Sequence, residues 1–365
     1  MTSSSEAPIQ IRAEIGAVPA YRQGASPAPG GFKLSSNENP FPAPESVRAA
    51  VVDALQLGRY GSAAALELRG DLADRFGVGV DAVHLGAGSV ALLFQLVHAV
   101  AGEGDEVITA WPSFEAYPLL GLASGARHVP VAGTAAGEHD LDAMLAAVTD
   151  RTRAIILCSP NNPTGPALRA ADVARFLAAV PSTILVILDE AYREFVTAPD
   201  AVRGEDLRAG HPQLVLLRTF SKAYGLADLR VGYAIGEPSI LDAARVVGIP
   251  LSVTGIAQAG ARAALAAEAE LFGRIEELVA RRAELRDGLL AQGWAVPDAQ
   301  GNFVWLPAGE HAAALGEACL AAGILVRSFP GTGVRISVGE AESIPAVLAV
   351  TGAFVAAHPS SVEAR

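Results

Sequence analysis

Short apolar runs alternate with longer amphipathic segments between about residue 41 and residue 236. The runs have the length and β-branched content of buried strands: VHL at 83–85, EVITA at 106–110, AIILC at 154–158, TILVILD at 183–189, LVLLRTF at 214–220 and VGYAIG at 231–236. Segments between them have helical spacing, as in Val90, Leu93, Val97 and Val100. This alternation predicts a mostly parallel α/β sheet with helices on both faces, whose active residues lie at the carboxyl ends of the strands.

The pattern changes on either side of this region. Residues 1–40 are rich in Pro, Gly and Ser and predict an extended arm with little core of its own. After Pro250 a long helical stretch at 255–292 is followed by NFVWLP, a helix around 310–322, ILVRSF, VRISVG and a final helix. We therefore predict an arm at 1–40, which packs with the small domain or a partner subunit, a large domain at 41–245 and a smaller α+β domain at 246–365.

Composition narrows the possible functions. The chain has 365 residues, of which 51% are hydrophobic, so two domains are expected. A net charge of −12 disfavours nucleic acid and anionic membranes as partners, because both need a basic face. Cys158 and Cys319 form no CxxC pair, so neither a disulfide framework nor a zinc site is indicated. The first residues lack a basic segment followed by an apolar one, and no apolar run approaches membrane-spanning length, so we expect a cytoplasmic protein.

Lysine is scarce in this chain, and one lysine has unusual neighbours. Of the 27 lysines and arginines, only Lys33 and Lys222 are lysines. Lys222 follows a buried strand between the hydroxyls of Thr219 and Ser221, where burial can lower its pKa as an imine-forming amine requires. An isolated lysine would more often be a surface residue. Arg230, however, lies eight residues further on, and an arginine with a serine hydroxyl binds phosphate strongly.

Asp189 ends the run TILVILD, so its carboxylate emerges at the carboxyl end of a central strand. A buried acid is costly unless it meets a cation or caps a helix, and a pyridinium nitrogen is a suitable cation. Holding that nitrogen protonated makes the ring an electron sink. Tyr192 would then lie near the 3'-oxygen of the ring. Asn162, in the turn SPNNPTGP at 159–166, could present its amide to the same oxygen, or the turn could be structural only.

The segment GAGSVA at 86–91 lies between a short strand and a helix, where the backbone N–H groups around Gly88, Ser89 and Val90 can bind an anion. Gly86, Gly88 and Ala91 also fit the GxGxxG/A fingerprint of dinucleotide-binding proteins. That alternative requires an acidic residue at the end of the next strand. Acidic residues precede the strand EVITA instead, which disfavours NAD as the ligand.

Phe114 and Arg335 complete the set of candidates. Phe114 follows a strand and could stack on a flat ring, although an aromatic residue there is more often part of the core. Arg335, in VRISVG of the second domain, could bind a substrate carboxylate with two hydrogen bonds or be an ordinary surface arginine.

In their order along the chain, these segments resemble the fold-type I aminotransferases of class I and II, which depend on pyridoxal 5'-phosphate (PLP). The resemblance is strongest to the branch that holds histidinol-phosphate and aromatic amino acid (phenylalanine) aminotransferases. It covers about residues 30–340, through SSNENPFP, RY at 59–60, GAGS, PSFEAY, SPNNPTG, DEAYREF, RTFSKAYGLADLRVGY, NFVWLP and VRISVG. It implies the fold-type I architecture, PLP as cofactor and a homodimer with shared active sites.

The resemblance also implies roles for the matched residues in binding PLP. Lys222 would form the Schiff base and carry the proton, Asp189 would meet the pyridine nitrogen, and Tyr192 would bind the ring oxygen; these three are the catalytic candidates. The other cofactor contacts implied are Phe114 stacked on the ring, Asn162 at the ring oxygen, and Ser221, Arg230, Gly88, Ser89 and Val90 at the phosphate, with Tyr60 reaching in from the partner subunit.

For the substrate, the resemblance implies that Arg335 binds the α-carboxylate beside Asn162 and that Tyr21 of the arm closes over it. Val90-Ala91 stands where histidinol-phosphate enzymes usually have Asp-Glu, which favours the aromatic branch. Two other departures leave local questions open. Asp228 replaces the usual glycine near Arg230, and Gly61-Ser62 replaces the usual Pro-Asp after Tyr60.

The predicted reaction is therefore a ping-pong transamination through pyridoxamine phosphate, from phenylalanine or tyrosine to 2-oxoglutarate. Transamination of histidinol phosphate is the nearest alternative. A PLP-dependent decarboxylase of the same fold is the second, and a non-catalytic PLP-binding regulatory module is the third.

Overall fold

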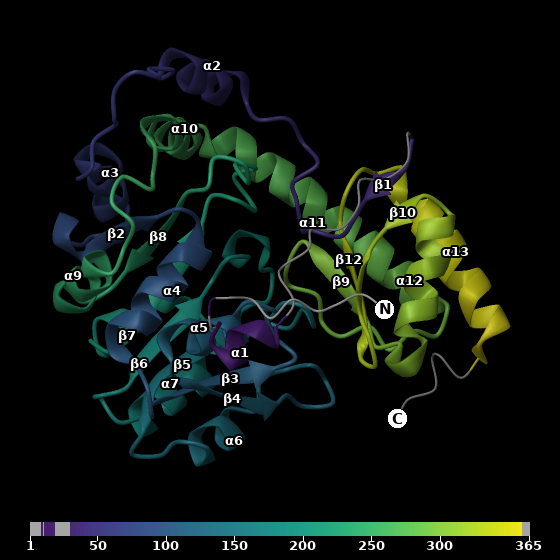
Figure 1. The fold of residues 1–365 in the computed structure, drawn as a ribbon. Helices are drawn as coiled ribbons and strands as arrows, with labels where there is room; N and C mark the ends of the chain where they lie inside the picture. The colour runs from purple at the N-terminus through teal and green to yellow at the C-terminus, as the bar shows by residue number, and fades with distance from the viewer. Residues whose placement is uncertain (1–8, 10, 19–29, 360–365) are drawn as a thin grey trace.

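The computed structural model describes residues 9, 11–18 and 30–359, and its larger part is built on a seven-stranded sheet (Figure 1). The strand order is β2-β8-β7-β6-β5-β3-β4, and all neighbours pair in parallel except at β8, which runs antiparallel to β2 and β7. The strands are β2 (Val83–Gly86), β3 (Glu106–Trp111), β4 (Arg127–Ala132), β5 (Thr152–Cys158), β6 (Leu185–Asp189), β7 (Leu214–Thr219) and β8 (Gly232–Ile235). The predicted mostly parallel sheet is confirmed.

Every predicted run forms one of these strands, with ends that differ by at most two residues. Strand β4 is the one that the apolar pattern does not reveal. It lies at the edge of the sheet beside β3, its residues are exposed or half-buried, and it contains Pro130. An edge strand needs only one buried side and tolerates proline, so it lacks the continuous apolar run of a central strand.

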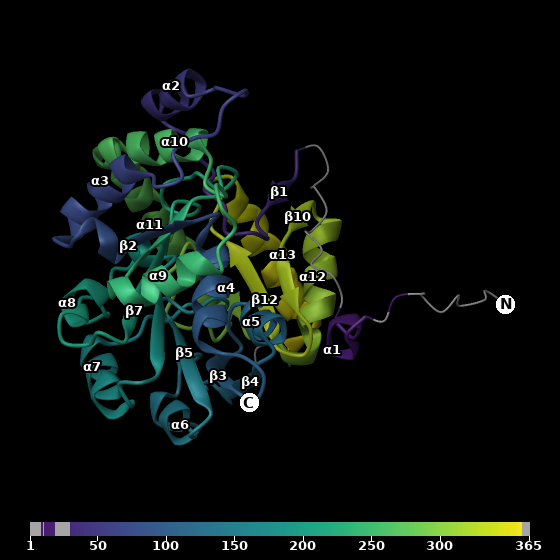
Figure 2. The same ribbon diagram turned by 60° about the vertical axis from the view of Figure 1, so that its left-hand side comes forward.

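Helices cover both faces of this sheet (Figure 2). On one face lie α4 (Ser89–Val100), α5 (Tyr117–Ser124) and α9 (Pro238–Val246); on the other lie α3 (Leu66–Phe76), α6 (Leu141–Ala146) and α7 (Ala170–Ala179). In β6, Val186 and Leu188 pack in one apolar cluster and Leu185 and Ile187 in the other. Burial on both faces explains why the central strands are continuously apolar.

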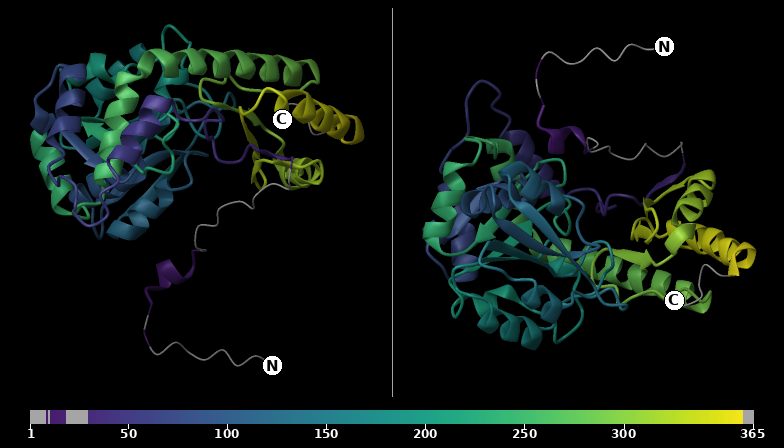
Figure 3. Two further views of the ribbon diagram at one scale, coloured as in Figure 1. Left: turned by 90° about the horizontal axis from the view of Figure 1, so that it is seen from above. Right: turned by 60° about the horizontal axis from the view of Figure 1, so that its bottom comes forward.

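A long helix connects the two parts of the molecule (Figure 3). The predicted helical stretch 255–292 is divided at Ala267 into α10 (Gly255–Ala266) and α11 (Glu268–Ala291). α10 packs against α2 (Glu45–Asp53) and α3. Along α11, Leu271 joins the core of the large sheet, whereas Leu289 joins a separate core at the carboxyl-terminal end. The short helices are α1 (Ala13–Gly16), α8 (Gly204–Arg208), η1 (Val80–Ala82), η2 (Arg193–Phe195) and η3 (Gly309–His311).

The smaller part contains an antiparallel sheet in the order β11-β12-β9, made of β9 (Phe303–Leu306), β11 (Arg327–Phe329) and β12 (Gly333–Ser337). Helices α12 (Ala312–Ala321) and α13 (Ser343–Ala357) pack in its core. The expected strand 324–329 is interrupted, because β10 (Ile324–Leu325) pairs with β1 (Phe32–Lys33) of the amino-terminal segment. The division at residues 40 and 245 stays a prediction. Within the described residues, no helix has both the length and the apolar character needed to cross a membrane.

Candidate active site

The candidate residues of the large sheet meet at the carboxyl ends of three neighbouring strands. Asp189 is the last residue of β6, and the parallel register places it beside Cys158 of β5 and Leu217 of β7. Asn162 lies in the turn after β5, and Lys222 lies in the turn after β7. Parallel pairing thus brings together side chains that are separated by up to sixty residues in sequence.

Lys222 is half-buried, and its Nζ donates a hydrogen bond to the Ser36 carbonyl at 3.1 Å. Nζ also lies 5.8 Å from the centre of the Tyr192 ring. Burial lowers the pKa of Lys222 to about 7, and the positive charges of Arg335 and Arg230 act in the same direction. A large fraction of this amine is therefore neutral at physiological pH, as condensation with an aldehyde requires.

Asp189 is buried and has two hydrogen-bond donors. Its Oδ2 accepts from the Tyr117 hydroxyl at 2.9 Å, and its Oδ1 accepts from the backbone N–H of Ala191 at 3.2 Å. Burial raises the pKa of Asp189 to about 6, and the hydrogen bond from Tyr117 opposes this rise. The carboxylate is therefore mainly ionised at neutral pH, in surroundings where a cationic partner stabilises it. Tyr117 of α5 was not predicted, because only the tertiary contact distinguishes it from a core tyrosine.

Tyr192 belongs to a buried polar network centred on Asn37. The amide Nδ2 of Asn37 donates to the Tyr192 hydroxyl at 3.0 Å, and Ser337 Oγ donates to Asn37 Oδ1 at 2.8 Å. The carbonyl of Asn37 accepts from the Asn302 amide at 3.1 Å. Burial raises the pKa of Tyr192 to about 12, so the hydroxyl keeps its proton and can donate it to a ligand oxygen. Asn37 was also missed as a site residue; a φ of 52° in a buried position marks it as special.

Arg335 on β12 reaches across from the small sheet to the turn that carries Asn162. Its Nη1 donates to Asn162 Oδ1 at 2.6 Å, and its Nη2 donates to the Ser35 carbonyl at 2.5 Å. Both Arg335 and Asn162 are buried. The structure therefore places these two predicted substrate-binding residues together.

The residues predicted to bind a phosphate meet at the amino end of α4. Gly88 precedes the helix with a φ of 77°, and a Cβ added there would lie 2.5 Å from Arg230 Nη2. Arg230 Nη1 also donates to Ser221 Oγ at 3.3 Å. The guanidinium, the hydroxyl and the free N–H groups at Ser89 and Val90 thus converge. Asp228, which stands where a glycine is usual, is exposed.

The structure places three other predicted site residues differently from the cluster described above. Tyr60 is 87% exposed and lies outside the cluster formed by this chain. Phe114 is half-buried and makes an edge contact with the Tyr117 ring at 5.6 Å between centroids. Tyr21 lies outside the described residues. The loop that carries Tyr60 passes over the start of α10, where a Cβ on Gly61 would lie 2.7 Å from the backbone nitrogen of Gly255. This close approach explains the glycine at 61.

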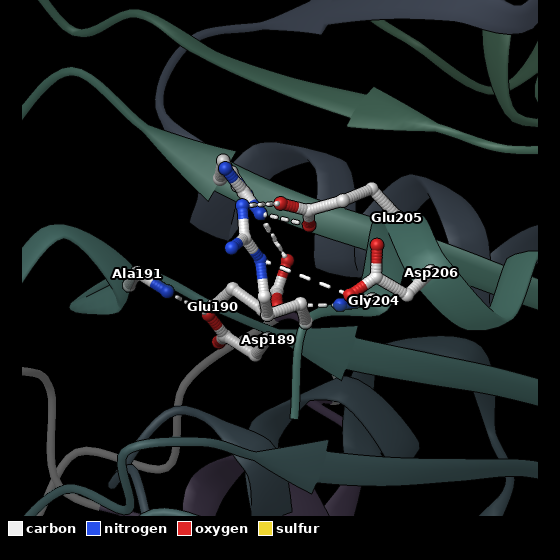
Figure 4. Close-up of polar contacts among 8 residues, drawn as sticks. Asp189, Glu190, Ala191, Gly204, Glu205 and Asp206 are labelled. Atoms are coloured by element: carbon white, nitrogen blue, oxygen red, sulfur yellow. Dashed lines mark hydrogen bonds and ion pairs between the residues drawn. The ribbon is translucent and has the colours of Figure 1, made fainter. Parts of the chain in front are cut away.

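Glu190, the residue after Asp189, belongs to a buried ionic network. Asp189 and Glu190 lie on opposite sides of the end of β6, and Glu190 accepts from the Gly204 backbone N–H at 3.0 Å (Figure 4). Arg218 donates to Glu190 Oε2 from Nη2 at 2.9 Å and from Nε at 3.0 Å, and to Glu205 Oε2 at 2.6 Å. Negative charges around Arg218 raise its pKa well above the usual value despite its burial.

We expect Arg218→Met to lower the free energy of unfolding by about 3–5 kcal/mol, because it leaves the Glu190 carboxylate buried without its cation. Urea unfolding followed by circular dichroism measures this change. Arg203→Met is the matched control, since Arg203 also contacts Glu205 but is mostly exposed, and it should cost less than about 1 kcal/mol. Equal costs for the two variants would contradict the assignment.

Comparison with known proteins gives a consistent result. The family model for aminotransferase class I and II matches residues 29–350. The chain is 48% identical over 354 residues to an aromatic amino acid aminotransferase of Streptomyces coelicolor, covering 96% of this chain and 99% of the relative. It is 49% identical over 357 residues to another of that name from Thermobifida fusca, with the same coverage.

Solved structures share the fold. A histidinol-phosphate aminotransferase from Sinorhizobium meliloti, in complex with pyridoxal-5'-phosphate, superposes with a TM-score of 0.85 at 27% identity and covers 98% of this chain and 99% of its own. An aspartate aminotransferase of Thermus thermophilus, a mutant form, superposes with a TM-score of 0.81 at 25% identity and covers 94% and 99%.

Proposed function

Because the chain belongs to the class I and II aminotransferases, we propose that it transfers the amino group of an aromatic L-amino acid, such as phenylalanine or tyrosine, to a 2-oxo acid. The observation that carries the substrate class is the 48% and 49% identity, over nearly the whole chain, to proteins named for that activity. We expect 2-oxoglutarate as the acceptor and ping-pong kinetics, in which the first product leaves before the second substrate binds. A cytoplasmic role in amino-acid biosynthesis is part of the same proposal.

The donor set at the carboxyl edge of the sheet fits PLP. Arg230, Ser221 and the amino end of α4 form a cradle for a phosphate, next to a glycine whose Cβ would fill it. The Asp189 carboxylate suits a ring nitrogen, and the hydroxyl of Tyr192 with the amide of Asn162 suits the ring oxygen. PLP would supply an aldehyde that condenses with amines and a ring that withdraws electrons from the substrate Cα.

In the proposed reaction each of these residues has a separate role. Arg335 orients the substrate by its carboxylate, exchanging its present acceptors for the ligand. Lys222, as a neutral amine, takes the proton from the substrate Cα and returns a proton later in the reaction. Asp189, which is buried, would hold a negative charge against the ring nitrogen of the cofactor. The polar network of Asn37 holds the Tyr192 hydroxyl in place.

We expect the rate at which cofactor-free protein captures PLP to rise about tenfold per pH unit below pH 7 and to level off above about pH 8. The neutral fraction of Lys222 follows this course if its pKa is about 7, whereas an ordinary lysine would continue to gain until above pH 10. Stopped-flow absorbance between pH 5.5 and 9.5 measures the profile, with Nα-acetyl-lysine as the reference amine. A rate that still rises steeply above pH 9 would show that the pKa of Lys222 is not lowered.

The proposed enzyme is a homodimer with shared sites. Nine of the exposed large apolar side chains lie in two segments, at Val52, Leu55, Leu57, Tyr60 and Leu66 and at Val246, Val247, Ile249 and Leu251. The segments approach each other at the start of α10, where Gly61 lies against Gly255. Such a surface is typical of a subunit interface. We expect a sedimentation mass of twice 37.4 kDa, and a monomer in the micromolar range would contradict the shared site.

Steady-state kinetics with phenylalanine, tyrosine and histidinol phosphate test the proposed substrate class. Histidinol phosphate remains the second candidate, because the structural neighbour from Sinorhizobium meliloti carries that name. A kcat/KM at least about tenfold higher for phenylalanine or tyrosine supports the aromatic assignment, and the reverse order refutes it. Release of carbon dioxide without formation of a 2-oxo acid would instead indicate a decarboxylase.

A further inference from the structure

Two arginines lie side by side on one face of the small sheet. The register pairs Arg335 of β12 with Arg327 of β11, and residues directly opposite each other in antiparallel strands point to the same face. Arg335 uses this face to reach Asn162. The adjacent Ser328 points the other way, since its Oγ occupies the space where a Cβ on Gly316 of α12 would lie. Arg327 therefore points to the same side as the carboxylate-binding arginine.

Arg327 is paired with a carboxylate, whereas two hydrogen bonds of Arg335 go to neutral oxygens. Arg335 donates to an amide oxygen and to a carbonyl, which are neutral. Arg327 makes a two-pronged ion pair with Glu115, with Nη2–Oε1 at 2.6 Å and Nε–Oε2 at 3.2 Å. The side chains of this pair are 27% and 39% exposed, so a ligand or solvent can reach them. Glu115 follows Phe114 in the loop after β3, and the pair thus connects the large sheet to the small one.

This ion pair changes the charge that a substrate meets. A carboxylate carries one negative charge and is satisfied by one guanidinium with two hydrogen bonds. A phosphate monoester carries close to two negative charges at pH 7 and gains from a second guanidinium. With Glu115 in place, one of the two neighbouring positive charges is already neutralised. A phosphate would have to displace Glu115 or approach it, and like charges repel.

We infer that Glu115 is a specificity-determining residue: by pairing with Arg327, it makes the site select amino acids with a carboxylate over amino alcohol phosphate esters. The inference rests on the proposed function and deepens it. Histidinol phosphate belongs to the disfavoured class, since a phosphate ester stands in place of its carboxylate. Glu115 acts through Arg327 and does not need to touch the substrate.

The test uses the PLP-loaded Glu115→Gln variant, with kcat and KM measured separately for phenylalanine and histidinol phosphate. We expect the ratio of kcat/KM for histidinol phosphate to that for phenylalanine to rise at least about tenfold, mainly through a lower KM for the phosphate ester. The competitive inhibition constant of inorganic phosphate against phenylalanine should fall as well. In Glu115→Gln/Arg327→Gln both gains should disappear, because the released guanidinium is absent.

Glu67→Gln is the matched control, since Glu67 also pairs with an arginine, Arg262, but on the outer helix α3. It should leave the ratio unchanged. If Glu115→Gln lowers kcat/KM for both substrates alike, the pair is only structural and the inference is wrong. Wild-type protein that uses histidinol phosphate and no aromatic amino acid would refute the proposed function, and this inference with it. If the wild-type protein uses aromatic amino acids but Glu115→Gln leaves the ratio of the two kcat/KM values unchanged, the inference about Glu115 is wrong and the proposed function stands.

Discussion

Lys222→Ala is expected to lower kcat by about a thousandfold or more, the largest effect that we predict for a single side chain. The proton on the substrate Cα then has no neutral amine within reach, and positioned general bases contribute about 10²–10⁴-fold. This decrease in kcat should exceed the decrease caused by substituting any neighbouring residue, because Lys222 is both the amine that binds the cofactor and the base.

The same substitution is not expected to unfold the protein. The pKa of Lys222 is lowered from 10.5 to about 7 in the folded state, so the unfolded chain binds more protons between those pH values. Stability contributed by this group therefore rises with pH from about 7 to about 10.5, and below pH 7 the buried ammonium is a cost. Lys222→Ala should unfold at pH 7 with a free energy equal to or above that of the unchanged protein.

The scarcity of lysine makes the assignment simple to verify. Borohydride reduction of the PLP-loaded protein should attach one phosphopyridoxyl group, which mass spectrometry of peptides locates on Lys222. Lys33→Ala is the natural control, since Lys33 is the other lysine and pairs with Glu38 at 2.8 Å. Lys33→Ala should retain the label and Lys222→Ala should lose it. A label on Lys33, or transamination that survives in Lys222→Ala, contradicts the proposed site.

Asp189→Asn is expected to lower kcat/KM by about a hundredfold or more. The amide has a shape close to that of the carboxylate but no charge, so the ring nitrogen loses the anion that keeps it protonated. Removing one partner of a buried charge pair typically costs about 3–5 kcal/mol, which corresponds to more than a hundredfold in rate or affinity. The cofactor spectrum should change with the protonation of the ring, which separates this effect from simple loss of PLP.

In the cofactor-free protein the expected effect of Asp189→Asn on stability has the opposite sign. The folded pKa of Asp189 is raised from 3.8 to about 6, so the folded chain binds more protons between those values and stability falls as pH rises through that window. At pH 8 the buried carboxylate is a cost that Asn removes.

Thermal unfolding with and without PLP tests both effects of Asp189→Asn. The variant should be at least as stable as wild type without PLP, but gain less from adding it. Asp142→Asn, on the exposed side of α6, is the control and should gain as much as wild type. An unchanged PLP gain in Asp189→Asn would refute the contact between this carboxylate and the ring.

Much of this architecture follows from local sequence. The central strands are buried on both faces, so their residues had to be apolar in unbroken runs, and this made β5, β6 and β7 readable with ends correct to within two residues. Site candidates at strand ends could be predicted as well, because a polar residue at the end of an apolar run is easily recognised in the sequence. Edge strand β4 and the split of 324–329 were not readable, since pairing with β3 and β1 depends on distant segments.

By itself the sequence determined the order of the central strands and the family resemblance, and it predicted Lys222 as the amine, Asp189 as the acid and Arg230 as the phosphate-binding arginine. Only the tertiary structure decided which side chains complete the site. Tyr117 at Asp189, Asn37 at Tyr192 and Glu115 at Arg327 come from segments 72, 155 and 212 residues away from their partners. No local periodicity encodes such contacts, because they arise when strand ends and the two sheets are brought together. The burial that lowers the pKa of Lys222, and the charges of Arg335 and Arg230 that act with it, depend on the same assembly.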